Sequence, residues 1–188
     1  MKIVGFVASP RKQGNTAWVL NEVLEGARGN GATTKLFCSG DLDIRPCQGC
    51  YGCKHGDSGC VVKDDMQKLY GELKSADTLV FGSPVYMGQM TAQAKIFTDR
   101  LFASHSPRFS PYFKEENATR IKMVLVFTQG NPDSGLFQPY FDYTKDMFQV
   151  LGFDVKDTQV VAGLRNGPAH ERKELQASLY ELGASLLL

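Results

Sequence analysis

Four of the five cysteines of this 188-residue chain lie in one short segment. Three of them have C-x2-C-x2-C spacing and the fourth follows a stretch that contains glycine: Cys47, Cys50, Cys53 and Cys60. The first three spacings equal those of bacterial cluster-binding sequences, which supply soft thiolate ligands from one tight loop. A fourth thiolate can complete the coordination of a [4Fe-4S] cluster, so the segment predicts a metal ligand set and electron transfer.

Two other interpretations of the cysteines stay open. A structural zinc ion is one, although zinc sites usually take their ligands from two separated C-x2-C pairs. The other is a metal-free loop that lines a neighbouring site, assists packing or acts as a redox-sensing group. His55 lies between the third and fourth cysteines, but a lone histidine in a polar loop is more often solvated than a ligand. Cys38 stands apart and is expected to be a buried, inert thiol.

A second segment with the residues for chemistry follows the first apolar run. Residues 9–16 have the sequence Ser-Pro-Arg-Lys-Gln-Gly-Asn-Thr and lead into a helical pattern. Backbone N–H groups at a helix start, hydroxyls, an amide and a cation can surround a phosphate monoester, and glycine lets the backbone approach closely. The predicted phosphate-binding residues are Ser9, Arg11, Gly14, Asn15 and Thr16. The segment matches neither the Walker A nor the G-x-G-x-x-G pattern, which favours a mononucleotide. An ordinary capped turn is the alternative.

The elements that position these segments follow an alternating pattern. Short apolar runs rich in β-branched residues alternate with helical patterns, which is typical of an α/β fold with a parallel sheet covered on both faces. The predicted strands are 2–8, 33–37, 78–82, 122–128 and 155–162. The predicted helices are 16–28, one that begins at Asp64 and Asp65, 91–102, 138–151 and 169–187. Asn15 or Thr16 is expected to cap the first helix.

Three segments of the chain resemble the NAD(P)H-dependent FMN reductase family of flavodoxin-like proteins: 8–16, 82–90 and 95–100. The resemblance covers nearly the whole chain. With the cysteine segment, the chain is most similar to the iron-sulfur flavoprotein branch, whose members pair FMN with a [4Fe-4S] cluster. The resemblance implies a flavodoxin-like three-layer sandwich with a five-stranded parallel sheet in the order 2-1-3-4-5. We therefore expect a single FMN-binding domain over residues 1–188, with a cysteine-rich insertion at about 40–63.

The resemblance also implies roles for individual residues. Ser9, Arg11, Asn15 and Thr16 would hold the FMN phosphate. The isoalloxazine would be lined by Pro84, Val85, Tyr86, Met87, Gly88 and Gln89. Physical reasoning agrees, because residues 82–90 connect a strand end to a helix start, where backbone N–H groups can face the pyrimidine edge of a flavin. Tyr86 can pack against the ring, although simple packing would explain this aromatic residue equally well.

A third contributor to the ring site is expected just beyond the fourth strand. Thr128, Gln129 and Gly130 can donate to the ring or approach it closely, and an ordinary turn before Pro132 is the alternative. Asp99 and Arg100 match the family pattern within a helix. An ion pair at the helix terminus would explain that pair of residues equally well.

The leading hypothesis is an FMN-dependent oxidoreductase. It would pass electrons from NAD(P)H or a reduced donor protein, through FMN and the cluster, to an acceptor such as free flavin, a quinone, dioxygen or a protein. No catalytic side chain is predicted, because the chemistry belongs to the flavin. One alternative is a ferredoxin-linked electron carrier with no small-molecule substrate. Another is a metal-free flavoprotein whose cysteines are redox-sensing or structural.

Composition limits the partners that this chain is expected to have. Lys and Arg number 21 and Asp and Glu 20, so the net charge of +1 predicts neither nucleic acid nor an anionic membrane as a partner. No apolar stretch approaches the length that spans a bilayer, and we expect a cytoplasmic protein. A homodimer or homotetramer is expected, since a cluster on one subunit can reach a flavin of its neighbour across an interface. Exposed aromatic residues could build that interface, although they could equally be core or lid residues: Tyr112, Phe113, Phe137, Tyr140 and Phe141.

Overall fold

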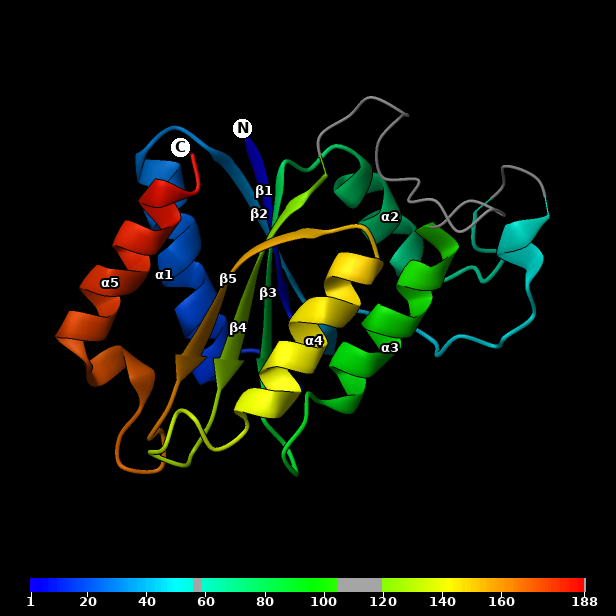
Figure 1. Ribbon diagram of the computed structural model, residues 1–188. Coiled ribbons are helices and arrows are strands. Elements are labelled where there is room, and N and C mark those ends of the chain that lie inside the picture. The colour runs from blue at the N-terminus through cyan, green and yellow to red at the C-terminus, as the bar shows by residue number, and fades with distance from the viewer. Residues whose placement is uncertain (56–58, 105–119, 188) are drawn as a thin grey trace.

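The computed structural model describes residues 1–55, 59–104 and 120–187. In this part of the chain, five parallel strands form one sheet in the order β2-β1-β3-β4-β5 (Figure 1). The strands are β1 (Lys2–Val7), β2 (Thr33–Cys38), β3 (Thr78–Pro84), β4 (Lys122–Thr128) and β5 (Asp154–Val161). The predicted α/β class and strand order are confirmed. The order reverses between β1 and β3, where doubly wound sheets bind ligands at the carboxyl ends of the strands.

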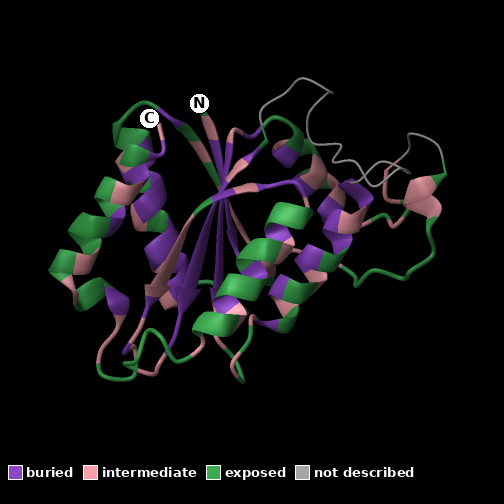
Figure 2. Ribbon diagram, viewed as in Figure 1, coloured by how far each residue is buried: buried purple, intermediate pink, exposed green. Residues whose placement is uncertain are grey.

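Helices cover both faces of the sheet and complete three layers (Figure 1). One face carries α1 (Asn15–Gly29) and α5 (Lys173–Ser185). The other carries α2 (Met66–Lys74), α3 (Ala92–Arg100) and α4 (Gln138–Val150). The central strands β1, β3 and β4 are buried along most of their length, whereas the edge strands β2 and β5 are mostly half-buried or exposed. Each helix buries only the side that faces the sheet (Figure 2). No helix in the described part of the chain is long and apolar enough to cross a bilayer.

The two faces of the sheet have cores of different character. The core under α2, α3 and α4 is rich in phenylalanine, with Phe6 stacked on Phe97 at 4.2 Å and Phe127 on Phe141 at 4.3 Å between ring centroids. The core under α1 and α5 is mostly aliphatic. Phe141 is fully buried, so its predicted exposure at an interface is wrong.

The other aromatic residues predicted for an interface divide into two groups. Phe137 and Tyr140 are partly buried and pack against the same aromatic core as Phe141. Tyr112 and Phe113 lie outside the described residues. On α4 the exposed aromatic residue is Tyr143 instead. The apolar side of α4 is therefore used mainly to cover the sheet.

The predicted cap of α1 is wrong. Gly14 occupies the N-cap position and provides no side chain, so the helix begins at Asn15 without a side-chain cap. Asn15 Oδ1 instead accepts a hydrogen bond from the backbone N–H of Ala169, at 3.0 Å. The hydroxyls of Thr16 and Thr128 bond to each other at 2.7 Å. The side-chain oxygens that were predicted to cap the helix therefore form hydrogen bonds with residues distant in the sequence.

The remaining helix boundaries differ from prediction by short turns. Asp64 and Asp65 precede α2, which begins at Met66, and Asp64 Oδ1 accepts from the Met66 amide at 3.1 Å. Thr91 is the N-cap of α3 and accepts from the Ala94 amide, and a 3-10 turn extends the helix end over Leu101–Ser104. A separate 3-10 turn over Ala169–Glu171 precedes α5.

Candidate functional site

A cavity of about 190 Å³ lies at the carboxyl ends of the strands, at the place where the strand order reverses. It is lined by Ser9, Arg11, Gly14, Asn15, Thr16, Pro84, Val85, Tyr86, Thr128, Gln129, Gly130 and Leu164. The structure thus brings together residues from all three predicted segments, which follow β1, β3 and β4. Leu164 was not predicted. Its signal is its position just after β5, whose carboxyl end lies at the same edge of the sheet.

The loop after β1 is folded around its own polar groups. The Ser9 hydroxyl, which is buried, accepts from the Arg11 amide at 3.1 Å, and the Gly14 amide donates to the Arg11 carbonyl at 3.2 Å. Arg11 itself is exposed. The first backbone N–H groups of α1 point out of a helix end without a side-chain cap, and such an end attracts anions. The loop therefore keeps the groups that a phosphate needs, namely helix N–H groups, hydroxyls and a guanidinium.

Hydrogen bonds between segments hold the walls of this cavity together. The Thr91 hydroxyl donates to the Ala8 carbonyl at 2.6 Å, and the Thr91 amide donates to the Ser83 hydroxyl at 3.1 Å. The Thr16–Thr128 hydroxyl pair joins α1 to the end of β4. These bonds connect the loops after β1, β3 and β4 through buried side chains, so the lining is fixed by the core of the fold.

Three residues predicted to line the ring lie elsewhere. Met87, Gly88 and Gln89 belong to a tight turn that two hydrogen bonds close. The Tyr86 amide donates to the Gln89 carbonyl at 2.8 Å, and the Gln89 amide donates to the Tyr86 carbonyl at 3.0 Å. Met87 and Gly88 have φ of 50° and 79°, and the Met87 side chain is 99% exposed. The turn projects away from the sheet, which explains why Pro84, Val85 and Tyr86 reach the cavity and the turn residues do not.

The backbone donors expected from residues 82–90 are mostly engaged within the protein. The Val85 amide donates to the Thr128 carbonyl at 2.8 Å, and the Met90 amide donates to the Tyr140 hydroxyl at 3.1 Å. The amides of Tyr86 and Gln89 close the turn. These four N–H groups therefore already donate within the protein, and contacts between this segment and the pyrimidine edge of a flavin stay a prediction.

Gln129 is a buried polar residue in the lining of the larger cavity. Its side chain is 3% exposed, and Nε2 donates to the carbonyls of Asp133 at 2.6 Å and Asn131 at 3.3 Å. Oε1 is buried and has no hydrogen-bond partner among the described residues. An unpaired buried acceptor is costly, and Gln129 is one of the residues that line the cavity, where a ligand N–H could satisfy such an acceptor. The pyrimidine edge of FMN carries such an N–H, so the residues present fit this group.

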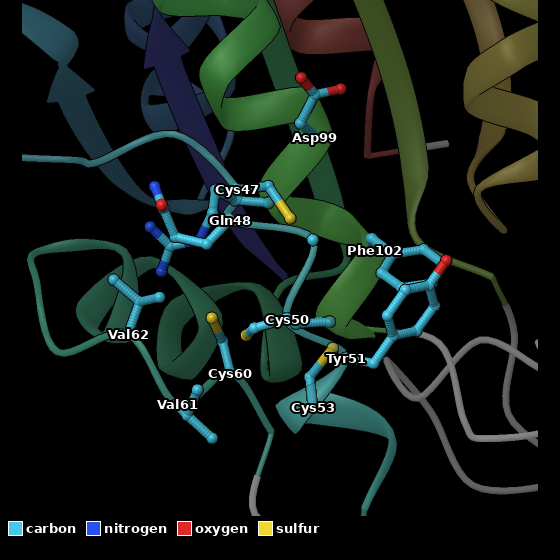
Figure 3. Close-up of a pocket in the computed structure, with 13 residues that line it drawn as sticks. Cys47, Gln48, Cys50, Tyr51, Cys53, Cys60, Val61, Val62, Asp99 and Phe102 are labelled. Atoms are coloured by element: carbon cyan, nitrogen blue, oxygen red, sulfur yellow. The ribbon is translucent and has the colours of Figure 1, made fainter.

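A second, smaller cavity of about 30 Å³ gathers the cysteines. All four thiols line it, together with residues from the end of α3, among them Asp99, Arg100 and Phe102 (Figure 3). The chain turns between the cysteines with positive φ at Gly49 and Tyr51, 61° and 54°. Tyr51 packs edge-on against Phe102 with ring centroids 6.0 Å apart. The predicted cysteine set is therefore brought to one place, although its partners on α3 were not predicted.

The base of the cysteine loop is closed by a buried ion pair. Arg100 and Asp64 are each 1% exposed at the side chain, with Nη1 at 2.5 Å from Oδ2 and Nη2 at 3.1 Å from Oδ1. Arg100 Nη1 also donates to the Arg45 carbonyl at 2.7 Å, and the Arg45 amide donates to Asp64 Oδ2 at 3.0 Å. One guanidinium thus binds the chain just before Cys47 and just after Cys60.

This pairing corrects the alternative interpretation of Asp99 and Arg100. Asp99 pairs with Lys95 at 2.5 Å, one turn earlier on α3, and Arg100 pairs across the fold with Asp64. Burial acts to raise the pKa of Asp64, but hydrogen bonds from Arg100, Arg45 and Met66 outweigh it and lower that pKa below its ordinary value. Both members of the ion pair are therefore held in their charged forms.

The four cysteines are suitable metal ligands by their chemistry, but their side chains are not already arranged around a metal position in the described residues. Over residues 1–55, 59–104 and 120–187, no group of three or more His, Cys, Asp or Glu side chains is arranged to hold a metal ion. Burial raises the pKa of Cys53, and the nearby Cys60 and Cys47 also act in that direction, against the effect of Lys54. His55 is exposed, and Cys38 is half-buried rather than fully buried. Four soft thiols around one small cavity fit an iron-sulfur cluster by their chemistry.

The sequence of the chain is similar to those of known proteins. The NADPH-dependent FMN reductase family matches the chain over residues 1–166. An iron-sulfur flavoprotein from Methanosarcina thermophila is 37% identical over 172 residues, which cover 91% of this chain and 85% of that protein. Another from Methanocaldococcus jannaschii is 37% identical over 100 residues, 53% of this chain and 51% of that protein, so this match spans about half the length of the relative.

Solved structures resemble the chain in fold. An NAD(P)H:quinone oxidoreductase from Methanothermobacter marburgensis superposes with a TM-score of 0.75 over 100% of this chain and 98% of that one. The two sequences are 18% identical. At this level of identity the likeness establishes the flavodoxin-like architecture.

Proposed function

Because the chain belongs to the NADPH-dependent FMN reductase family, we propose that it is an oxidoreductase that binds FMN at the carboxyl ends of β1, β3 and β4. In this proposal FMN accepts electrons from NADH or NADPH, or from a reduced donor protein. The observation that carries the proposal is the cavity itself. It is lined both by the loop with an uncapped helix start and by Gln129, whose buried Oε1 has no partner among the described residues.

Each part of the lining has a binding task in this proposal. The α1 N–H groups, the Ser9 hydroxyl and Arg11 hold the phosphate. Gln129 Oε1 accepts the ring N–H, and the phenol of Tyr86 packs beside the ring. Leu164 contributes an apolar surface that excludes water. When bound, FMN supplies the hydride and electron transfer chemistry, and the protein sets the orientation and exposure of the ring.

The cysteine loop adds a second redox centre in this proposal. Cys47, Cys50, Cys53 and Cys60 would hold a [4Fe-4S] cluster, supported by their convergence on one cavity and by the relative from Methanosarcina thermophila, an iron-sulfur flavoprotein. Such a cluster would carry electrons between FMN and an acceptor. A quinone is a candidate acceptor, because an NAD(P)H:quinone oxidoreductase shares the fold. A homo-oligomer in which electrons cross between subunits remains part of the proposal.

Reduction of the flavin tests the enzyme proposal. Anaerobically purified protein should lose its blue flavin absorption when NADH or NADPH is added, and should regain it with a quinone. Loss of the absorption with reduced ferredoxin but with neither nicotinamide would favour the electron-carrier alternative. If neither donor changes the flavin absorption, the proposed activity is wrong.

Iron content tests the proposed cluster separately. Protein purified without air should contain iron and acid-labile sulfide, and Cys60→Ser should lose both while it keeps FMN. Cys38→Ser is the matched control, because Cys38 lies at the end of β2 outside the cysteine cavity, and it should keep iron and FMN. Wild-type protein with FMN and no iron would favour the metal-free flavoprotein with redox-sensing or structural cysteines.

A further inference from the structure

Arg100 is a buried cation whose hydrogen bonds to the described residues are incomplete. It is the last residue of α3, and it ranks among the largest fully buried side chains of the described chain. Nη1 and Nη2 donate to Asp64 and to the Arg45 carbonyl. Nε, the third nitrogen, is buried and has no partner among the described residues. A charged donor that is buried without an acceptor is costly, which makes this nitrogen conspicuous.

The unpaired nitrogen belongs to a residue that lines the cysteine cavity. Asp64 holds the guanidinium through two nitrogens and balances its charge, so the plane of the group is fixed. Burial acts to lower the pKa of Arg100, but its hydrogen bonds to Asp64 and the nearby Tyr70 and Cys60 raise that pKa above its ordinary value. Arg100 and Cys60 line the same cavity.

Two other donors lie close to Cys60. Burial raises the pKa of Tyr70, and its interactions with the Cys60 side chain raise it further. The Tyr70 hydroxyl donates to the Arg100 carbonyl at 2.6 Å. Gln67 Nε2 donates to the backbone carbonyls of Cys60 at 2.9 Å and of Val62 at 2.7 Å, which fixes the backbone here. The backbone at Cys60 is thus fixed at the cavity that Arg100 also lines, and Arg100 Nε has no acceptor among the described residues.

We propose that Arg100 is a positioning residue of the cysteine site and that its Nε–H donates to the Cys60 sulfur when the thiolates are charged. This inference rests on the proposed role of the cysteines as ligands. A hydrogen bond to a ligand sulfur stabilises the more negative, reduced state of an iron-sulfur cluster and so raises its reduction potential. The ion pair with Asp64 also holds both ends of the cysteine loop. Arg100 would therefore both position the cysteine ligands and raise the reduction potential of the cluster.

Arg100→Lys separates this role from a general need for positive charge. Lysine keeps the cation and can still reach Asp64, but it lacks the planar fork with a separate Nε–H. The matched control is Lys95→Arg, on an exposed lysine of the same helix that pairs with Asp99. The double variant Asp64→Asn/Arg100→Met removes the buried charges together and keeps an oxygen for the Arg45 amide, as a second test should Arg100→Lys fold poorly.

Two measurements on the full-length protein test the inference. One is the reduction potential of the cluster in anaerobically purified protein, followed by its absorption and spin-resonance signals. The other is the binding of Co²⁺ alone to metal-free protein, followed by thiolate-to-cobalt charge-transfer absorption. We expect Arg100→Lys to have a lower cluster potential and about 10-fold weaker Co²⁺ binding, and Lys95→Arg to match wild type. The double variant should be folded and bind Co²⁺ at least as weakly as Arg100→Lys.

The outcomes distinguish this inference from the proposed function. Wild-type values for both measurements in Arg100→Lys, or wild-type Co²⁺ binding in the double variant, would overturn the role of Arg100. Wild-type protein that contains no iron would contradict the cluster, and the Co²⁺ comparison would then decide the role of Arg100 alone. Wild-type protein that gives no charge-transfer absorption with Co²⁺ would overturn the inference directly.

Discussion

At the scale of single residues, the linings of the two candidate sites share one feature: each includes a residue with a buried polar atom that has no hydrogen-bond partner in the described part of the chain. Gln129 Oε1 is this atom for the larger cavity, and Arg100 Nε is this atom for the cysteine cavity. Most buried polar groups in folded proteins are hydrogen-bonded, so exceptions inside a cavity point to a ligand. The position of Gln129 after a strand was enough to predict it as a site residue. The sequence could not show that its Oε1 is buried without a partner among the described residues.

Gln129→Met should weaken FMN binding by about 10- to 100-fold, because it removes the acceptor for the ring N–H and leaves that donor buried. The measurement is a fluorescence titration of apo-protein with FMN. Gln159→Met on β5 is the control, since its amide bonds to Asp157, outside the cavity lining, and it should bind as wild type does. Equal affinity in wild type and Gln129→Met would remove Gln129 from the site.

Asp64→Ala should cost about 3–5 kcal/mol in the free energy of unfolding, because it leaves the Arg100 guanidinium buried without its counter-ion. Urea unfolding checks this value. Asp99→Ala, which breaks an exposed pair with Lys95, should cost about 1 kcal/mol or less. Similar costs for the two substitutions would mean that the buried pair does not hold the loop base.

The Asp64 pair should also show a defined pH dependence. Its pKa is lower in the folded protein than the ordinary value of 3.8, so the carboxylate stabilises the fold above that value. The contribution is lost as pH falls through the lower, folded-state pKa. The difference in unfolding free energy between wild type and Asp64→Asn should therefore be constant near neutral pH and shrink below about pH 4. A difference that stays constant down to pH 2 would argue against a charged Asp64.

At the scale of elements, the strands could be predicted well and the helix ends less well. Strands such as Lys122–Thr128 are continuous apolar runs that are buried on both faces, and that pattern is visible in the sequence. Helix ends depend on distant partners. The start of α1 involves Ala169 through Asn15 and Thr128 through Thr16, which no local pattern shows. The Arg100–Asp64 pair joins residues 36 positions apart, and the sequence suggested the neighbouring Asp99 instead.

The contact between α1 and α5 depends on two glycines. A Cβ on Gly26 would lie 2.0 Å from the Tyr180 carbonyl oxygen, and one on Gly183 would lie 1.9 Å from the Val23 carbonyl oxygen. Gly26→Ala should therefore destabilise the protein by about 1–3 kcal/mol through overpacking. Gly71→Ala on α2, where no atom lies within 4 Å, should instead stabilise it by about 0.5–1 kcal/mol. Urea unfolding of the two variants checks both signs, and stabilisation by Gly26→Ala would contradict this packing.

At the scale of the whole molecule, α3 connects the two candidate sites. Its N-cap, Thr91, bonds to the Ala8 carbonyl beside the phosphate-binding loop, and its last residue, Arg100, lines the cysteine cavity. The nine residues of α3, Ala92–Arg100, span about 14 Å along the helix axis. One rigid element therefore relates the proposed flavin and cluster sites. Local sequence patterns nominated both sites, but only the fold shows that the same helix joins them.

Ligand binding should be visible in global stability. At a free FMN concentration 100 times its Kd, binding contributes about 2.7 kcal/mol, which should raise the Tm of the apo-protein by about 5–10 °C. Riboflavin, which lacks the phosphate, should raise the Tm less at the same concentration, because the helix start and Arg11 would have no anion to bind. Equal shifts for the two compounds would mean that the loop after β1 does not hold the phosphate.

Binding of FMN to the apo-protein is the most direct test of the central claim. Protein stripped of any flavin is titrated with FMN while the fluorescence of the flavin is recorded. The geometry of the cavity predicts saturable quenching at one FMN per chain, with weaker quenching by riboflavin. If FMN fluorescence is unchanged at saturating concentrations of folded apo-protein, the cavity at the carboxyl ends of β1, β3 and β4 is not a flavin site.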